Sequence, residues 1–139
     1  MAVVTKELDV ASKGENYVVD LTEDVRKAVR ESGLEGGIVT VFVSGSTAAV
    51  TTMEFEPGLV KDFPAMLERV SPRDREYEHQ KTWNDGNGHS HVKAALVGPS
   101  LTVPFVGGDL AVGKWQQVIF VEFDIRPRRR RVVVQIVGE

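Results

Sequence analysis

The chain has 139 residues, of which 42% are hydrophobic and 27% are charged, and its formal net charge is −3. These proportions are typical of one globular domain, and they argue against a disordered chain or a second core. The absence of cysteine excludes disulfides and thiolate nucleophiles, and the negative charge argues against general binding to nucleic acid or anionic membranes. With no basic leader and no apolar run of about 20 residues, we expect a cytoplasmic protein without a membrane segment.

The first third of the chain predicts two strands and a helix. Val3–Ala11 and Asn16–Leu21 are extended runs joined through Gly14, a pattern that predicts a β-hairpin. Thr22 is expected to cap a helix, because two acidic residues follow it. The helix is expected to end at Gly33, because glycine readily adopts the left-handed conformation found at helix C-termini.

The middle of the chain predicts two further strands and a second helix. Ile38–Val43 is rich in β-branched residues, and a strand is expected within Gly45–Glu54. Apolar residues then recur at helical spacing from Pro57 until Ser71, and Pro64 inside that pattern is expected to kink or divide the helix.

The last third begins with a polar segment, residues 73–91, and continues with three strands at Ser100–Val106, Val118–Asp124 and Arg131–Val137. Many strands with few helices predict an α+β fold. We expect one domain over residues 1–139, with a mainly antiparallel sheet, a β-sandwich-like core and two or three helices.

All three histidines, His79, His89 and His91, fall within the polar segment. Histidine is the commonest metal ligand among side chains and the best acid–base group near neutral pH. On a strand, His89 and His91 would share one face, but on a helix they would lie about 200° apart. A polar surface loop is the alternative interpretation.

Two carboxylates upstream, Glu54 and Asp62, are candidates to join the histidines, either as metal ligands or by orienting an imidazole. The arginine-rich run from Arg126 to Arg131 is a candidate phosphate clamp, although a solvated turn or a nucleic-acid patch remains possible. If this run is extended, Arg128 and Arg130 share one face.

Several short motifs occur in an order that resembles the YjbQ family, also called secondary thiamine-phosphate synthases. The motifs are Asn87-Gly88-His89-Ser90-His91, Gly98-Pro99-Ser100, Gly113-Lys114-Trp115-Gln116, Glu122, Asp124 and Arg128-Arg129-Arg130. The resemblance extends from about residue 38 to the C-terminus. It implies a trimeric α+β protein whose polar sites lie near subunit contacts.

The resemblance also implies an activity, in which a pyrimidine diphosphate is joined to a thiazole phosphate with release of pyrophosphate. A small phosphorylated substrate, a divalent ion (Mg²⁺ or Zn²⁺) and a homotrimer are therefore expected. The expected catalytic residues are His89, His91 and Glu54. The expected phosphate-binding residues are Asn87, Ser46, Thr47, Arg128 and Arg130, and the expected metal ligands are His79, His89, His91 and Asp62.

One position departs from the family's pattern. Many members carry a histidine where this chain has Gly45, so related chemistry on a different substrate is possible. The run Gly45-Ser46-Thr47 is alternatively a small anion-binding loop built from backbone N–H groups and hydroxyls. Two other functions stay open on the sequence, namely a metal-dependent hydrolase and a non-catalytic module that binds nucleotides or RNA.

Overall fold

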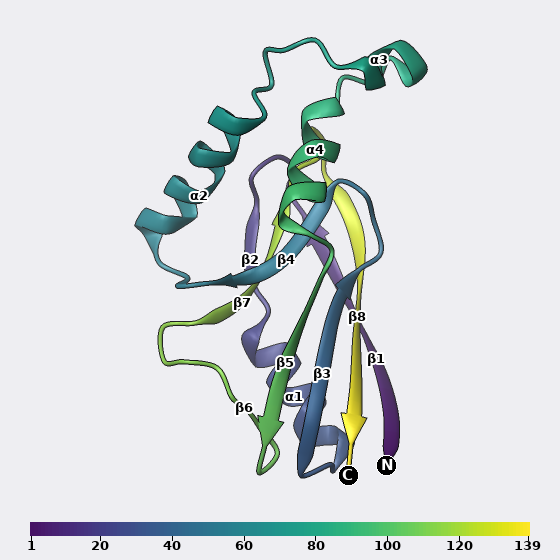
Figure 1. The fold of residues 1–139 in the computed structure, drawn as a ribbon, viewed down its shortest axis with the longest axis vertical. Coiled ribbons are helices and arrows are strands. Elements are labelled where there is room, and N and C mark those ends of the chain that lie inside the picture. The colour runs from purple at the N-terminus through teal and green to yellow at the C-terminus, as the bar shows by residue number, and fades with distance from the viewer.

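The computed structural model describes residues 1–139 and contains eight strands and four helices (Figure 1). The strands are β1 (Ala2–Ser12), β2 (Val18–Asp20), β3 (Gly36–Val43), β4 (Ala48–Met53), β5 (Ser100–Val106), β6 (Asp109–Leu110), β7 (Gln117–Glu122) and β8 (Arg128–Gly138). The helices are α1 (Thr22–Ser32), α2 (Pro57–Val70), α3 (Glu78–Trp83) and α4 (Gly88–Val97).

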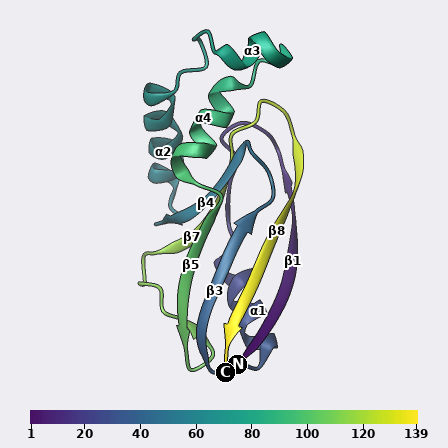
Figure 2. The same ribbon diagram turned by 45° about the vertical axis from the view of Figure 1, so that its right-hand side comes forward.

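The strands form two antiparallel sheets. One has five strands in the order β1-β8-β3-β5-β6, and the other has three in the order β2-β7-β4. The long strands β5, β3, β8 and β1 lie side by side in both views, with α1 behind them and α2, α3 and α4 gathered at one end (Figures 1 and 2). The predicted α+β class with a mainly antiparallel sheet is confirmed.

The core has two parts because β7 is buried on both faces. Val118 and Phe120 pack in an 18-residue cluster with the five-stranded sheet and α1, whereas Ile119 and Val121 pack in a 7-residue cluster with α2 and α4. Alternate residues of a strand point to opposite sides, so a strand between two layers is apolar throughout. The three-stranded sheet is thus a middle layer that supports α4.

The predicted hairpin between the first two strands is wrong. The chain turns at Gly14, whose φ is 108°, but β1 and β2 pair in different sheets. β1 pairs with β8 along its whole length, from Ala2 opposite Gly138 to Ser12 opposite Arg128, whereas β2 pairs with β7. A full-length partner satisfies more backbone groups of β1 than the three-residue β2 can.

The helices differ from the sequence-based expectation in three respects. Asp20, rather than Thr22, accepts the first free backbone N–H of α1, at 2.9 Å from the nitrogen of Thr22. Gly33 ends that helix in the left-handed conformation, as predicted. α2 continues unbroken through Pro64, and α3 is a fourth helix that forms inside the polar segment.

None of the four helices has both the length and the apolar character needed to cross a bilayer.

Candidate functional site

A cavity of about 340 Å³ opens at the end of the molecule where α3 and α4 meet the two sheets. Four segments line it: the loop after β3, α3 with the turn that follows it, the start of α4, and the connection from β7 into β8. The lining residues are Gly45, Ser46, Thr47, His79, Trp83, Asp85, Asn87, His91, Asp124, Arg128 and Arg130.

Two arginines on one face of β8 form one wall of the cavity. Arg130 donates from Nε to Glu122 Oε1 at 2.8 Å and from Nη2 to Thr47 Oγ1 at 2.6 Å. Arg128 donates from Nε and Nη2 to Asp124 Oδ2, at 2.9 and 2.7 Å. Neither Nη1 group makes a hydrogen bond within the chain, so each guanidinium is fixed along one edge and keeps free donors.

The carboxylates that fix these arginines are buried beneath the cavity. Glu122 also accepts from Ser12 Oγ at 2.7 Å, and Asp124 accepts from Thr47 Oγ1 at 3.0 Å. Burial acts to raise the pKa of Asp124, but hydrogen bonds from Arg128, the Ile125 N–H and Thr47 outweigh it and lower the pKa below its usual value. The charged wall is therefore held in place before any ligand arrives.

The loop after β3 adds backbone donors to this wall. Thr47 is buried, Ser46 is exposed, and the backbone N–H groups of both residues make no hydrogen bond within the chain. Consecutive free N–H groups form a concave site that suits an anion.

Two histidines form the opposite wall. The rings of His79 and His91 lie 4.3 Å apart between centroids, and His79 Nε2 is 3.2 Å from Asp85 Oδ1. The Asn87 side chain contacts both His79 and Asp85. With its amide nitrogen turned toward Asp85, it donates to that carboxylate at 2.8 Å. Burial and the neighbouring His79 lower the pKa of His91, so its imidazole is neutral at pH 7 and can accept a proton.

A single glycine brings the two histidine-bearing helices together. A methyl group at Gly88 would lie 2.5 Å from Tyr77 Cβ and 2.6 Å from Gln80 Oε1, so only glycine lets α3 pack directly on the start of α4. This close approach places His79 of α3 beside His91 of α4.

Seven of the residues singled out from the sequence come together in this cavity, while three lie elsewhere. The seven are Ser46, Thr47, His79, Asn87, His91, Arg128 and Arg130. Arg128 and Arg130 share a face as alternation predicts, whereas Arg129 and Arg131 turn away and pair with Asp9 and Glu7 of β1.

His89 does not join the other two histidines, which corrects the expected convergence. Because this segment is helical, His89 and His91 project about 200° apart. His89 is fully buried on the far side of α4, where its Nε2 lies 2.7 Å from Glu15 Oε1 and its Nδ1 has no partner.

Glu54 and Asp62 also lie outside the cavity. Glu54 follows β4 and is half-buried, and Asp62 is exposed on α2. The four expected metal ligands therefore do not meet, and no group of three His, Cys, Asp or Glu side chains is placed to hold a metal ion. The residues present do not fit a metal site made by protein ligands alone.

Sequence reasoning missed the roles of Glu122, Asp124, Asp85 and Trp83. Glu122 is the last residue of β7, a buried strand, and Asp124 follows two residues later. A buried acidic residue at the end of an apolar strand indicates a charge that is paired within the chain. Trp83 is the last residue of α3 and Asp85 lies in the turn that follows. The position of both depends on the contact of α3 with Gly88. No pattern in the sequence indicates that contact.

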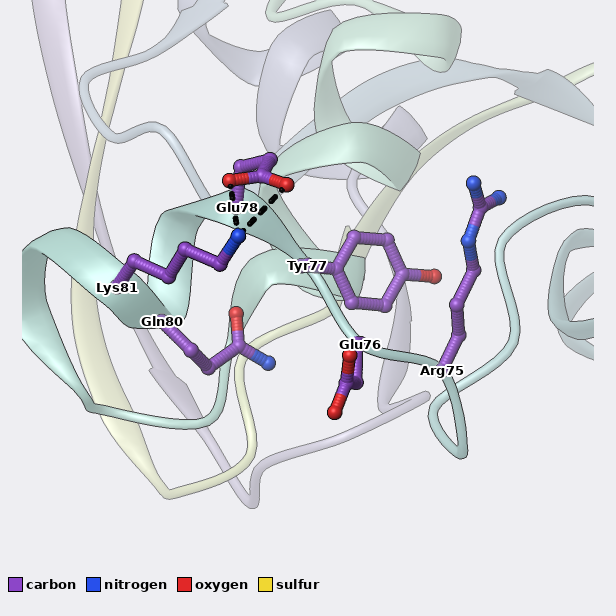
Figure 3. A pocket seen from close by; sticks show the side chains of 6 residues that line it. All are labelled: Arg75, Glu76, Tyr77, Glu78, Gln80 and Lys81. Carbon is purple, nitrogen blue, oxygen red and sulfur yellow. Dashed lines mark hydrogen bonds and ion pairs between the residues drawn. The ribbon is translucent and has the colours of Figure 1, made fainter.

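A second hollow of about 340 Å³ lies on the outer side of α3 and has a different character (Figure 3). One continuous segment lines it, residues 75–81 without His79, and Lys81 pairs there with Glu78 at 2.9 Å. It gathers no side chains from distant parts of the chain, and it offers no catalytic arrangement.

Comparisons with known proteins point to one family. The model of the family described as "UPF0047 protein YjbQ-like" matches residues 6–139. A UPF0047 protein of Methanothermobacter thermautotrophicus is 37% identical over 139 residues, which span all of this chain and 95% of the relative. One of Archaeoglobus fulgidus is 37% identical over 118 residues, 85% of this chain and 89% of the relative.

Solved structures agree with the sequence relatives. The crystal structure of a YbjQ-like protein of unknown function from Sulfolobus solfataricus has a TM-score of 0.92 and 32% identity, and the match covers 99% of each chain. A hypothetical protein from Aeropyrum pernix has a TM-score of 0.89 and 32% identity, with 98% of this chain and 99% of that one covered.

Proposed function

Because this chain belongs to the YjbQ-like UPF0047 family, we propose that its cavity binds the phosphate group of a small molecule and that the chain is a group-transfer enzyme. The observation that carries the proposal is the pair of guanidinium groups on Arg128 and Arg130. Each is fixed by a buried carboxylate and keeps a free Nη1, and both stand beside the unbonded N–H groups of Ser46 and Thr47. Phosphate oxygens suit such preorganised donors.

The reaction proposed is that of a secondary thiamine-phosphate synthase, in which a thiazole phosphate displaces pyrophosphate from a pyrimidine diphosphate. The lone pair of the thiazole ring nitrogen forms a bond to the carbon that carries the diphosphate, the bond from that carbon to the diphosphate oxygen breaks, and pyrophosphate leaves with the electron pair. Arg128 and Arg130 stabilise the charge that develops on the leaving group. His91, neutral because its pKa is lowered, can accept a hydrogen bond from the substrate, and Asn87 and His79 hold Asp85 at the mouth of the cavity.

A magnesium ion is proposed as part of the substrate rather than as a resident of the protein. Mg²⁺ is commonly held by one or two carboxylates together with substrate phosphates. Asp85 is the cavity carboxylate without an arginine partner, and it is exposed. It is the residue proposed to meet a diphosphate-bound ion.

Neither alternative function gains a supporting observation. A zinc hydrolase needs about three protein ligands around one ion, and no such group is present. For an RNA-binding module the arginine run would need to be a free cationic stripe, but Arg129 and Arg131 pair with carboxylates of β1.

Titration calorimetry with pyrophosphate tests the proposal on two neighbouring arginines. Arg128→Ala should weaken binding by about 1.5–3 kcal/mol, the range for a hydrogen bond to a charged group. Arg129→Ala, the matched control on the other face of β8, should change it by less than about 0.5 kcal/mol. Equal small losses with a steep salt dependence would contradict the proposal and indicate a diffuse cationic patch.

The expected homotrimer and cytoplasmic location stay predictions. The uncovered face of the five-stranded sheet offers a surface for contacts between subunits. The outer face of the five-stranded sheet is uncovered in both ribbon views (Figures 1 and 2), and it exposes Val3, Ile38, Phe42 and Val106. Contiguous exposed apolar groups mark interaction surfaces. Light scattering at micromolar concentration should give three times the 15.3 kDa of one chain, and a monomer mass would contradict the trimer.

A further inference from the structure

A third hollow adjoins the cavity and differs from it in chemistry. It has a volume of about 380 Å³ and shares Gly45, Ser46 and His91 with the cavity. The rest of its lining is small and apolar: Ala48, Ala94, Ala95 and Pro99. An ionic compartment and an apolar compartment therefore meet along one border, and His91 stands on that border.

Gly45 keeps this border open. A methyl group at this position would lie 2.6 Å from Arg130 Nη1, closer than a real contact allows. The tip of Arg130 has little freedom to move aside, because Glu122 and Thr47 hold Nε and Nη2. The backbone at Gly45 is not in the left-handed region, so the glycine is required for space rather than for its conformation.

We propose that the cavity and the third hollow form one binding site and that Gly45 is the passage between them. The ligand is then a phosphorylated molecule with a compact apolar group attached close to its phosphate. The phosphate lies on the Nη1 groups of Arg128 and Arg130, and the apolar group lies against Ala48, Ala95 and Pro99. This inference rests on the proposed phosphate binding, and it adds a subsite and the residue that opens it.

The position of His91 follows from the same arrangement. A ligand that spans both compartments places the junction between its phosphate and its apolar group beside His91. The imidazole is neutral because burial and His79 lower its pKa, so a hydrogen-bond acceptor stands beside this junction.

Calorimetry with two probes, inorganic phosphate and phenyl phosphate, tests the inference. On the unaltered protein phenyl phosphate should bind about tenfold more tightly, as expected when a ring removes a modest apolar area from water. Ala95→Leu fills the hollow from an exposed helix position, so it should remove that tenfold preference and leave phosphate binding unchanged. Gly45→Ala should weaken both probes, because it displaces Arg130 Nη1.

Ala65→Leu is the matched control, because Ala65 is an exposed alanine of α2 that lines neither hollow. It should leave both affinities unchanged. If neither probe binds the unaltered protein, the proposed function fails and the inference fails with it. If phosphate binds but phenyl phosphate binds no tighter, or if Ala95→Leu keeps the preference, only the inference is overturned. A change of mass in light scattering for Ala95→Leu, with the ligand preference intact, would also overturn it and assign the hollow to a contact between copies.

Discussion

His89 and His91 stand two residues apart on α4, yet the helix places them in opposite surroundings. His89 is fully buried and bonded to Glu15, which is itself held by Arg73 at 2.6 Å. His91 is half-buried and faces the cavity, and its imidazole forms no hydrogen bond within the chain. The same side chain is a structural anchor on one face of the helix and an unengaged base on the other.

The buried face of α4 carries a second pair that makes the contrast clearer. Lys93 is almost fully buried and donates to Glu68 Oε1 at 2.6 Å. Burial acts to raise the pKa of Glu68, but the hydrogen bonds from Lys93 and from the Arg73 N–H outweigh it and lower the pKa. His89 Nε2 and Lys93 Nζ on this face bind carboxylates of the same chain, although His89 Nδ1 has no partner, whereas the imidazole of His91 lines the cavity. The comparison shows that access to the cavity, rather than a histidine as such, marks the site.

The largest expected effect comes from removing the anchor. His89→Ala should lower the free energy of unfolding by about 2–3 kcal/mol, since it removes a buried hydrogen bond to a charged group and leaves Glu15 with Arg73 alone. His91→Ala, the matched change on the other face, should cost less than about 1 kcal/mol. Urea denaturation of the two variants measures both values, and equal losses would end the distinction between the faces.

A smaller effect should appear in the pH dependence of stability. The pKa of His91 is lowered in the folded chain, whereas in the unfolded chain it stands near 6.5. Below about pH 6.5 the unfolded chain therefore binds more protons, so stability falls as the pH falls through this window. His91→Asn should make that slope shallower by at most about 1.4 kcal/mol per pH unit, the limit for one proton. Denaturation at a series of pH values checks this, and an unchanged slope would show that His91 does not titrate differently on folding.

Most strands and helix ends could be predicted because the local sequence pattern of each segment agrees with its place in the fold. The strand expected at Val118–Asp124 is present as β7, and Gly33 ends α1 as predicted. The pairing of β1 could not be predicted, since Gly14 permits a turn without deciding which strand comes next to Ser12. Strand partners depend on the whole chain, and a turn residue carries only local information.

The candidate site was predictable where residues are close in sequence or alternate along a strand. Arg128 and Arg130 share a face because β8 is extended, and Asn87 and His91 share the first turn of α4. His89 was misplaced because its role depends on whether residues 88–97 are helical, which the sequence left open. The positions of Asp85 and Trp83 at the cavity depend on contacts between segments, and the same holds for the burial of Glu122 beneath Arg130.

The packing at Gly88 has a consequence for how the cavity comes into being. α3 contributes no buried residue to either core, and it rests on α4 through the close approach at Gly88 and the His79–Asn87 contact. Segments with few buried contacts open at a lower free energy than the domain that carries them. We therefore expect α3, which carries His79, to open locally while both sheets and α4 stay folded. On this expectation the arginine wall on β8 persists, whereas the contribution of His79 depends on a local folding equilibrium of α3.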